Sequence, residues 1–150
     1  MKHHWQVLSF TEFTLEQLYA VLRLRQQVFV VEQQSIYLDL DNRDQQALHM
    51  LCTLDDQLLA YQRMLPPGLS YPESAMGRIV VSPTARGLQM GKQLVQRGIA
   101  FNRETWPASD IRINAQLYLQ VFYEQLGFVV QGDEYDEDGI PHIQMLCRAI

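Results

Sequence analysis

The chain has 150 residues, of which 47% are hydrophobic and 19% are charged. That length suits one domain, residues 1–150, which can bury roughly 70% of the surface that its unfolded form exposes, and the composition excludes wholesale disorder. Twelve Lys and Arg against 17 Asp and Glu give a formal charge of −5, which argues against nucleic acid as a partner and favours cationic molecules.

The two cysteines and the apolar runs exclude further classes. Cys52 and Cys147 belong to no CxxC or His/Cys cluster, so we expect neither a disulfide framework nor a metal site. No apolar run approaches the roughly 20 residues of a membrane span, and the first six residues lack the apolar region of a secretory signal. The expected location is therefore the cytoplasm, with no membrane as partner.

The predicted elements alternate between strands and helices. Thr14-Leu15-Glu16-Gln17 has the form of a capping box, so a helix is expected to begin there, and its apolar spacing continues to about Val31. The Asp-rich and Asn-rich residues 37–44 predict a loop. Strands are expected over 5–10, 48–54, 58–65, 76–81, 111–115, 128–130 and 142–149, and helices over 14–31, 86–105 and 119–126.

This order, β α β β β α β α β β, predicts an α/β fold with a mixed sheet. The acidic run 133–138 is expected to be a solvated loop, although beside an acceptor site it would attract a polyamine or a lysine-rich peptide. The alternating strand 143–149 offers an edge that can pair across a homodimer.

The segment 76–98 carries the clearest chemistry. A buried strand, a tight turn and a helix start follow one another, and free N–H groups at a helix start make an anion site. Gly87 and Gly91 remove side chains that would block a phosphate, although two glycines also suit ordinary packing. A P-loop does not fit, because only three residues separate these glycines and Gln93 stands where Ser or Thr would hold magnesium; no G-x-G-x-x-G exists either.

The turn from Arg86 to Gly91 resembles the acetyl-CoA motif R/Q-x-x-G-x-G/A of the GNAT family of N-acetyltransferases. Gln89 stands where that motif has its central glycine. The segment 122–128, Phe-Tyr-Glu-Gln-Leu-Gly-Phe, is similar to the family element Y-E-x-x-G-F, and Gln116 stands where many members carry Asn. The segments 25–33, 41–49 and 137–142, together with Arg86-Gly87, are similar to the ElaA branch of the family.

The resemblance implies a GNAT-type fold with a mostly antiparallel central sheet flanked by helices. It further implies that the strand at 79–81 splays from the one at 111–115 and that the pantetheine arm of acetyl-CoA fills the gap. Main-chain amides of 86–92 would bind the diphosphate, and an amide near Val81 would polarise the thioester carbonyl. The residues implied to bind the donor are Ile79, Val80, Val81, Arg86, Gly87, Leu88, Gln89, Met90, Gly91, Lys92, Gln116, Phe122 and Tyr123.

The attacking amine must be neutral. Removing a proton from an alkylammonium of pKa about 10.4 at pH 7 costs about 4.6 kcal/mol, so a base is required. The candidates are Glu32, His49, Glu137 and His142, with Glu32 and His142 ranked first because both lie in ElaA-like segments; a surface carboxylate or a structural histidine is the competing reading. Tyr123 matches the family's general acid for the CoA thiolate, and a core tyrosine is the alternative.

The sequence therefore predicts an acetyl-CoA-dependent N-acetyltransferase that transfers the acetyl group to a primary amine by direct attack in a ternary complex. Its partners are acetyl-CoA and an amine acceptor, either a small molecule or a peptide. The alternative is a non-catalytic acyl-CoA-binding or sensing protein on the same fold, and a purely structural domain is a third reading.

Overall fold

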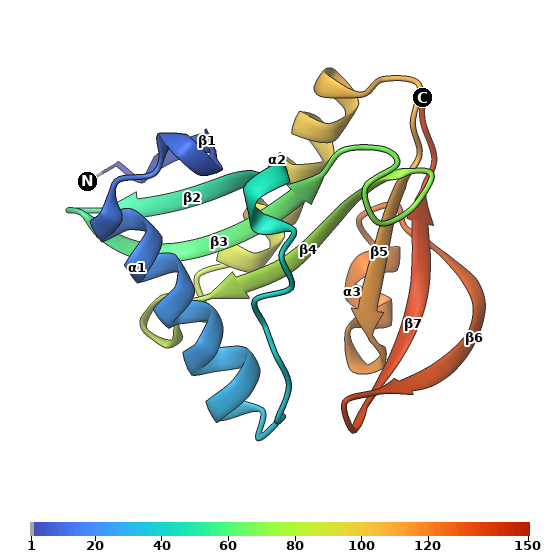
Figure 1. Cartoon of the computed structure of the whole chain (residues 1–150). Coiled ribbons are helices and arrows are strands. Elements are labelled where there is room, and N and C mark those ends of the chain that lie inside the picture. The colour runs from blue at the N-terminus through green and yellow to red at the C-terminus, as the bar shows by residue number, and fades with distance from the viewer. Residues whose placement is uncertain (1) are drawn as a thin grey trace.

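A computed structural model describes residues 2–150 and places all of their strands in one sheet (Figure 1). The strand order is β1-β2-β3-β4-β5-β7-β6, and only the β4/β5 pair is parallel. The expected mixed, mostly antiparallel sheet is confirmed. The strands are β1 (His4–Ser9), β2 (Leu48–Leu54), β3 (Gln57–Leu65), β4 (Ser74–Val81), β5 (Ile111–Gln116), β6 (Val129–Glu137) and β7 (Ile140–Cys147).

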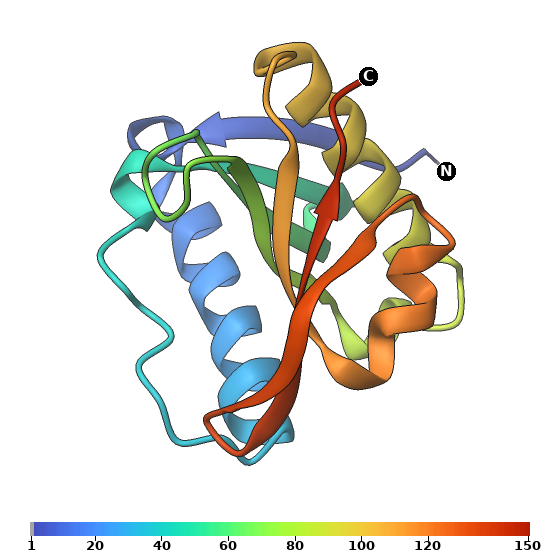
Figure 2. The same ribbon diagram turned by 90° about the vertical axis from the view of Figure 1, so that its right-hand side faces the viewer.

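Helices cover both faces of this sheet: α1 lies on one face, and α2 and α3 lie on the other (Figure 2). The helices are α1 (Leu15–Arg25), which continues directly into a π-helical segment (Gln26–Glu32), α2 (Met90–Thr105) and α3 (Gln120–Glu124). Strands and helices follow one another in the predicted order. None of the helices within residues 2–150 is both long and apolar enough to cross a membrane.

The two long helices differ from prediction at one end each. The capping box of α1 forms, since Thr14 Oγ1 accepts from the N–H of Gln17 at 3.1 Å and the Thr14 N–H donates to the Gln17 side chain at 2.9 Å. The regular helix stops at Arg25, however, and the next seven residues are π-helical. α2 begins at Met90 instead of near residue 86, because Gln89 has a left-handed backbone (φ 57°) that does not continue a helix.

The acidic run 133–138 is mostly strand, so the loop expected from the sequence is wrong. β6 continues to Glu137, and a turn of Asp138 and Gly139, both with positive φ, connects it to β7. β6 lies at the edge of the sheet with its carboxylates in solvent, so the strand forms without burying them. β7, in contrast, is paired on both sides, so the C-terminal strand has no free edge for a dimer.

β4 and β5 are joined at one end only. Their pairing is limited to residues 74–75 of β4 and 111–112 of β5, and the two strands then diverge (Figure 1). A β-bulge accompanies the divergence: Arg78 and Ile79 of β4 together face one residue of β3, Gln62, and Arg78 has a φ of 51°. Because a bulge bends its strand, it turns β4 away from β5. The expected splay is confirmed.

α2 approaches the sheet closely at a glycine. A Cβ at Gly98 would lie 2.6 Å from the side-chain amide atoms of Gln62 and 2.6 Å from Cε of Met76. Gln62 is fully buried, and its Nε2 donates to the carbonyl of Leu94 at 2.6 Å. Gly98 therefore sets the distance between α2 and the sheet, and with it the position of the helix start.

Replacing Gly98 by alanine should destabilise the protein, because the Gln62 amide must leave the Leu94 carbonyl or α2 must move off the sheet. We expect the free energy of unfolding in urea to fall by about 1–3 kcal/mol. Gln96→Ala, on the exposed face of the same helix, is the control and should change it by less than about 0.5 kcal/mol. Equal stability of Gly98→Ala and the wild type would contradict this account of the helix position.

Candidate active site

Two hollows meet at the end of β4. The larger, the central cavity, has a volume of about 730 Å³ and lies where β4 and β5 diverge, between the π-helical segment and the β6–β7 turn. The smaller, the loop hollow, has a volume of about 470 Å³ and lies between the start of α2 and Phe122 of α3. Val81 and Arg86 line both, so one extended molecule can occupy the two.

The loop hollow is built from main chain. The N-cap of α2 is Gln89, and no side chain accepts a hydrogen bond from the first turn, so the first N–H groups of the helix are left for another acceptor. Gly87 supplies a positive φ of 84° in the turn. A Cβ at Gly91 would touch only Val81 Cγ2 at 3.9 Å and Phe122 Cζ at 4.0 Å, so packing does not require this glycine. It leaves room in the hollow.

The free edge of β4 faces the central cavity. The N–H of Ser82 donates to the carbonyl of Leu59 at 2.8 Å, which directs it toward β3. Successive N–H groups of an extended strand point to opposite edges, so the N–H of Val81 points away from β3. It is therefore available to a ligand that lies beside β4.

Tyr123 reaches the central cavity from α3. Its ring packs edge-to-face on Phe122 and Phe128, with centroid distances of 5.2 and 5.8 Å, and only 6% of the residue is exposed. Its hydroxyl has no hydrogen bond to any residue among 2–150. Burial, followed by the charge of Tyr118, raises the pKa of the Tyr123 phenol above its usual value, so this group stays protonated.

A histidine of β7 and a carboxylate at the end of β6 line another side of the central cavity. His142 Nδ1 lies 2.7 Å from the carbonyl of Ile140 and must donate, since a carbonyl only accepts. This leaves the lone pair of neutral His142 on Nε2, which lies 3.6 Å from Oε2 of Glu137. The same Glu137 oxygen accepts from Asn114 at 2.8 Å. A proton taken up by Nε2 would therefore meet a carboxylate.

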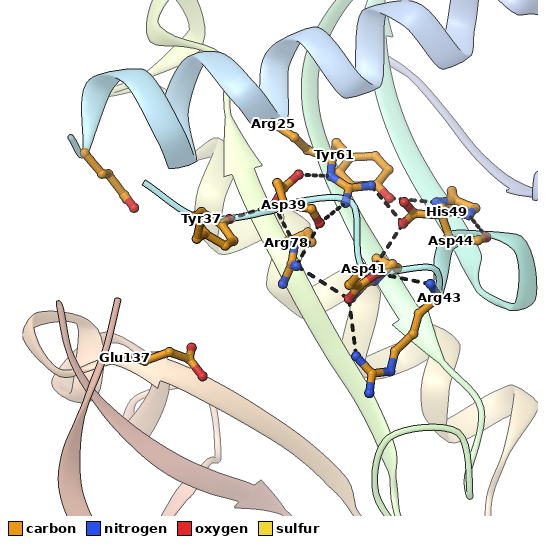
Figure 3. A network of polar contacts seen from close by, with 12 residues as sticks. Arg25, Tyr37, Asp39, Asp41, Arg43, Asp44, His49, Tyr61, Arg78 and Glu137 are labelled. Carbon is orange, nitrogen blue, oxygen red and sulfur yellow. Dashed lines mark hydrogen bonds and ion pairs between the residues drawn. The ribbon is translucent and has the colours of Figure 1, made fainter. Parts of the chain in front are cut away.

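A network of buried charges lies behind the other wall of the central cavity (Figure 3). Arg25 donates to Asp39 at 2.7 Å and to Asp44 at 2.9 Å. Arg63 donates to Asp44 at 2.9 Å and, through both terminal nitrogens, to Asp41 at 2.8 Å. Because each ion is paired in good geometry, the low-dielectric interior tolerates the charges.

Arg78 connects this network to the bulge of β4. Its Nη2 donates to the carbonyl of Asp39 at 3.0 Å, and its Nε lies 2.7 Å from the Asp39 carboxylate. The hydroxyl of Tyr37 donates to the same carboxylate at 2.6 Å. The network therefore fixes the loop that follows the π-helical segment against β3 and β4.

The electrostatics of the network favour ionised carboxylates. Burial alone would raise the pKa of Asp41, but the hydrogen bonds and charge of Arg63 outweigh it and hold that pKa well below its usual range. The pKa of Asp44 is lowered in the same way by Arg25 and Arg63. Both carboxylates therefore remain charged at neutral pH.

The comparisons with known proteins agree with this geometry. A family model described as acetyltransferase (GNAT) domain matches residues 11–149. The chain belongs to the GNAT family. Protein ElaA of Escherichia coli K12 is 40% identical over 148 residues, 97% of either chain, and UPF0039 protein sll0451 of Synechocystis is 40% identical over 99% of this chain and 97% of its own.

Solved structures show the same GNAT fold. The crystal structure of E. coli ElaA matches with a TM-score of 0.92 and 38% identity over 98% of this chain and all of that one. That of an acyl-CoA N-acyltransferase from Pseudomonas aeruginosa matches with a TM-score of 0.93, the same identity and the same coverage. The chain is thus a GNAT acyltransferase of the ElaA-like branch, and GNAT proteins take an acyl-CoA as co-substrate.

Most residues predicted to bind the donor lie together in the GNAT fold. Ile79 and Val80 line the central cavity with Val81, whereas Leu88 is 62% exposed and lines neither hollow. Gln116 lies in the central cavity, where its Nε2 donates to the side chain of Gln33 at 3.1 Å. The predicted residues that line the loop hollow are Val81, Arg86, Gly87, Gln89, Met90, Gly91, Lys92 and Phe122.

The four candidates for the base differ in their contacts and burial. Both carboxylate oxygens of Glu32 accept hydrogen bonds from Arg86, at 3.0 and 2.8 Å. His49 is buried away from both hollows, where Tyr61 OH lies 2.7 Å from Nδ1 and the Asp44 carbonyl lies 2.9 Å from Nε2. Burial lowers the pKa of His49 despite these contacts. Glu32, Glu137 and His142 line the central cavity, and of these three Glu32 is held in an ion pair by Arg86.

The sequence analysis missed the buried charge network. One signal was present: Arg25 lies on the same helical face as Val21 and Val28, and an arginine on an apolar face needs a buried partner. The partners follow in a segment that the sequence identified only as a loop. Arg78 gave no signal, because its conformation depends on the register of β3 and β4.

The network makes stability depend on acidic pH. The pKa values of Asp41 and Asp44 are lowered in the folded state, so the unfolded chain binds more protons once the pH falls below about 4. The stability contributed by these carboxylates is present above that pH and is lost as the pH falls toward their folded pKa values. Asp41→Asn should lower the free energy of unfolding at pH 7 by on the order of 3 kcal/mol.

The same variant should show a shallower fall in stability between pH 5 and pH 2 than the wild type, measured by urea denaturation at each pH. Asp133→Asn, in the exposed edge strand, is the matched control and should leave both quantities unchanged. Parallel pH profiles of the wild type and Asp41→Asn would contradict the role given to this carboxylate.

Proposed function

We propose that the protein transfers the acetyl group of acetyl-CoA directly to a primary amine in a ternary complex. The observation that carries the proposal is the junction of the two hollows at the unpaired edge of β4. A donor with a phosphate end and an acyl end fits such a junction, because the phosphate end needs main-chain donors and the acyl end needs an open strand edge.

In this proposal the amides of residues 86–92 bind the diphosphate, where the positive end of the α2 dipole adds to them. Residues 79–81 bind the pantetheine arm along the free edge of β4, with Gln116 and Phe122 beside it. The left-handed backbone of Gln89 supports this arrangement, because the turn keeps the conformation that a glycine would give it. The departure from the family motif therefore does not disturb the loop.

The amine nitrogen attacks the thioester carbon, and the C–S bond breaks as the amide forms. The Val81 N–H stabilises the negative charge that develops on the carbonyl oxygen. Tyr123 donates a hydrogen bond to the departing thiolate. Because burial raises the pKa of this phenol, complete proton transfer to a thiolate of pKa near 8.5 is uphill, and the hydrogen bond is the larger part of its contribution.

We assign His142 as the base, since its Nε2 carries the free lone pair and Glu137 balances the charge that a proton would bring. Glu32, the other base candidate, contributes only after the diphosphate draws Arg86 away from it. Breaking the Arg86–Glu32 pair costs little free energy. Both side chains are more than 40% exposed, and such pairs contribute about 0–1 kcal/mol.

Adding one methyl group at Gly91 tests whether the loop hollow binds the donor. Gly91→Ala places a Cβ in the loop hollow, so we expect the dissociation constant for CoA, measured by calorimetry, to rise at least about tenfold. The melting temperature should stay the same or rise, because alanine favours a helix over glycine by up to about 1 kcal/mol. Gln93→Ala, at an exposed position of α2 that does not line the loop hollow, is the control and should bind CoA as the wild type does. Absence of saturable CoA binding in the wild type would refute the proposed function.

Turnover is testable at the leaving group. In an assay of thiol release from acetyl-CoA with a panel of primary amines, Tyr123→Phe should lower kcat by about 10–100-fold and leave the affinity for CoA unchanged. Tyr118→Phe removes a second phenol hydroxyl that lines the same cavity, and its kcat should remain within twofold of the wild type. CoA binding without thiol release from any amine would favour the non-catalytic acyl-CoA-binding protein. An equal loss in both variants would remove the specific role of Tyr123.

A further inference from the structure

The buried charge network, which forms one wall of the central cavity, contains more guanidinium groups than carboxylates. The connected set behind this wall contains four arginines, at positions 25, 43, 63 and 78, and three aspartates, at positions 39, 41 and 44. Its formal charge is therefore +1, in a protein whose total formal charge is −5. One positive charge on this wall has no carboxylate of its own.

The excess lies at Arg43 and Arg78, two of the three arginines of this set that line the cavity. Arg25 and Arg63 are buried, and close contacts with Asp39, Asp41 and Asp44 occupy their terminal nitrogens. Arg43 Nη1 lies 3.6 Å from a carboxylate that already binds Arg63 in bidentate form, and the Arg43 side chain is 46% exposed.

Arg78 offers a second donor from the same wall. Its Nη1 has no hydrogen bond to any residue in the described part of the chain, and its side chain remains 23% exposed. Arg43 and Arg78 lie on either side of Asp41 (Figure 3), and both line the central cavity. Two guanidinium groups that each keep a terminal nitrogen without a close partner suit an anionic group such as a carboxylate.

The facing wall has the opposite charge. Glu137 projects from the end of β6 toward the wall that carries Arg78 and Asp41 (Figure 3). Its Oε2 accepts from Asn114 and lies 3.6 Å from His142 Nε2, so the carboxylate stands beside the proposed base. The cavity is therefore positive on one side and negative on the other.

The phosphates of the donor do not account for the excess positive charge at Arg43 and Arg78. In the proposed function they lie in the loop hollow, which shares only Val81 and Arg86 with the central cavity. Arg43 and Arg78 do not line that hollow. Their charge is left for the acceptor.

On this basis, and resting on the proposed function, we infer that the acceptor is a free amino acid. Its ammonium group lies at Glu137 and His142, and its carboxylate contacts the exposed end of Arg43 and the unpaired Nη1 of Arg78. A polyamine or a lysine side chain of a protein would satisfy Glu137 but would bring no anion to the two arginines. In the reaction His142 takes one ammonium proton, the neutral amine attacks the thioester carbon and the C–S bond breaks. The second proton that the nitrogen loses goes to the CoA sulfur, which leaves as the thiol.

The test compares acceptors that differ only in the carboxylate. Thiol release from acetyl-CoA is measured with amino acids, with their primary amides and with the corresponding decarboxylated amines, beside spermidine and a lysine-rich peptide. The wild type should prefer the acid over the amide in kcat/KM. Arg43→Gln should reduce this acid-to-amide ratio of kcat/KM at least tenfold. The amino groups of the acid and the amide differ in basicity, but this difference is the same for both enzymes, so it drops out when the variant is compared with the wild type.

Arg23→Gln, on the exposed face of α1, is the control and should leave the acid-to-amide ratio unchanged. A second readout does not need turnover: the preferred amino acid should raise the melting temperature of the CoA complex in a saturable way, and Arg43→Gln should weaken that effect. Arg43 has no short side-chain contact in the fold, so this variant is expected to fold normally.

An unchanged acid-to-amide ratio in Arg43→Gln, or faster turnover of spermidine or the peptide than of every amino acid, overturns this inference and leaves the proposed function intact. Absence of thiol release from every acceptor overturns both. A tenfold loss of the ratio in Arg43→Gln alone, with the control unchanged, supports the amino acid as acceptor.

Discussion

The site depends on one strained residue. Arg78 has a positive φ in the middle of β4, a conformation that costs a side chain other than glycine about 1–2 kcal/mol. Its contacts with Asp39 and Asp41 hold it there. The resulting bulge bends β4 from β5, and without that divergence the sheet would close and the central cavity would not exist. The strained backbone of Arg78 thus leaves the edge of β4 that faces β5 unpaired beyond residue 75.

The buried ions explain why that strain persists. The three aspartates lie on an irregular segment that few apolar side chains attach to the sheet, since Ile36 and Leu38 are 99% and 86% exposed. Ion pairs with Arg25 on α1 and Arg63 on β3 attach it instead, from two directions. A buried pair is directional and strongly penalised when one partner is missing, so it fixes a loop geometry more narrowly than apolar contacts would.

The sequence predicted the loop hollow better than the charged walls of the central cavity. The turn 86–91 and the start of α2 follow from local signals, namely two glycines and a strand-to-helix transition, and the structure gathers eight of the predicted residues around one hollow. The capping box of α1 was equally local. The position of Arg78 and the pairing of Glu32 with Arg86 depend instead on contacts between residues up to 54 positions apart, which no short pattern contains. The acidic run was misread because its charges suggested a loop, whereas its place at the sheet edge lets a charged strand form.

The loop hollow and the central cavity also differ in the groups that they offer to a ligand. Main-chain groups form the loop hollow, so a side chain such as Gln89 can replace a glycine provided that the backbone keeps its left-handed turn. Side chains form the charged walls of the central cavity, where replacing Arg43 or Glu137 changes the charge that an acceptor meets. Because Arg43 and Glu137 do not line the loop hollow, we expect such changes to alter the choice of acceptor while the proposed diphosphate site stays as it is. A GNAT fold of this kind can therefore keep one donor while its acceptors diverge.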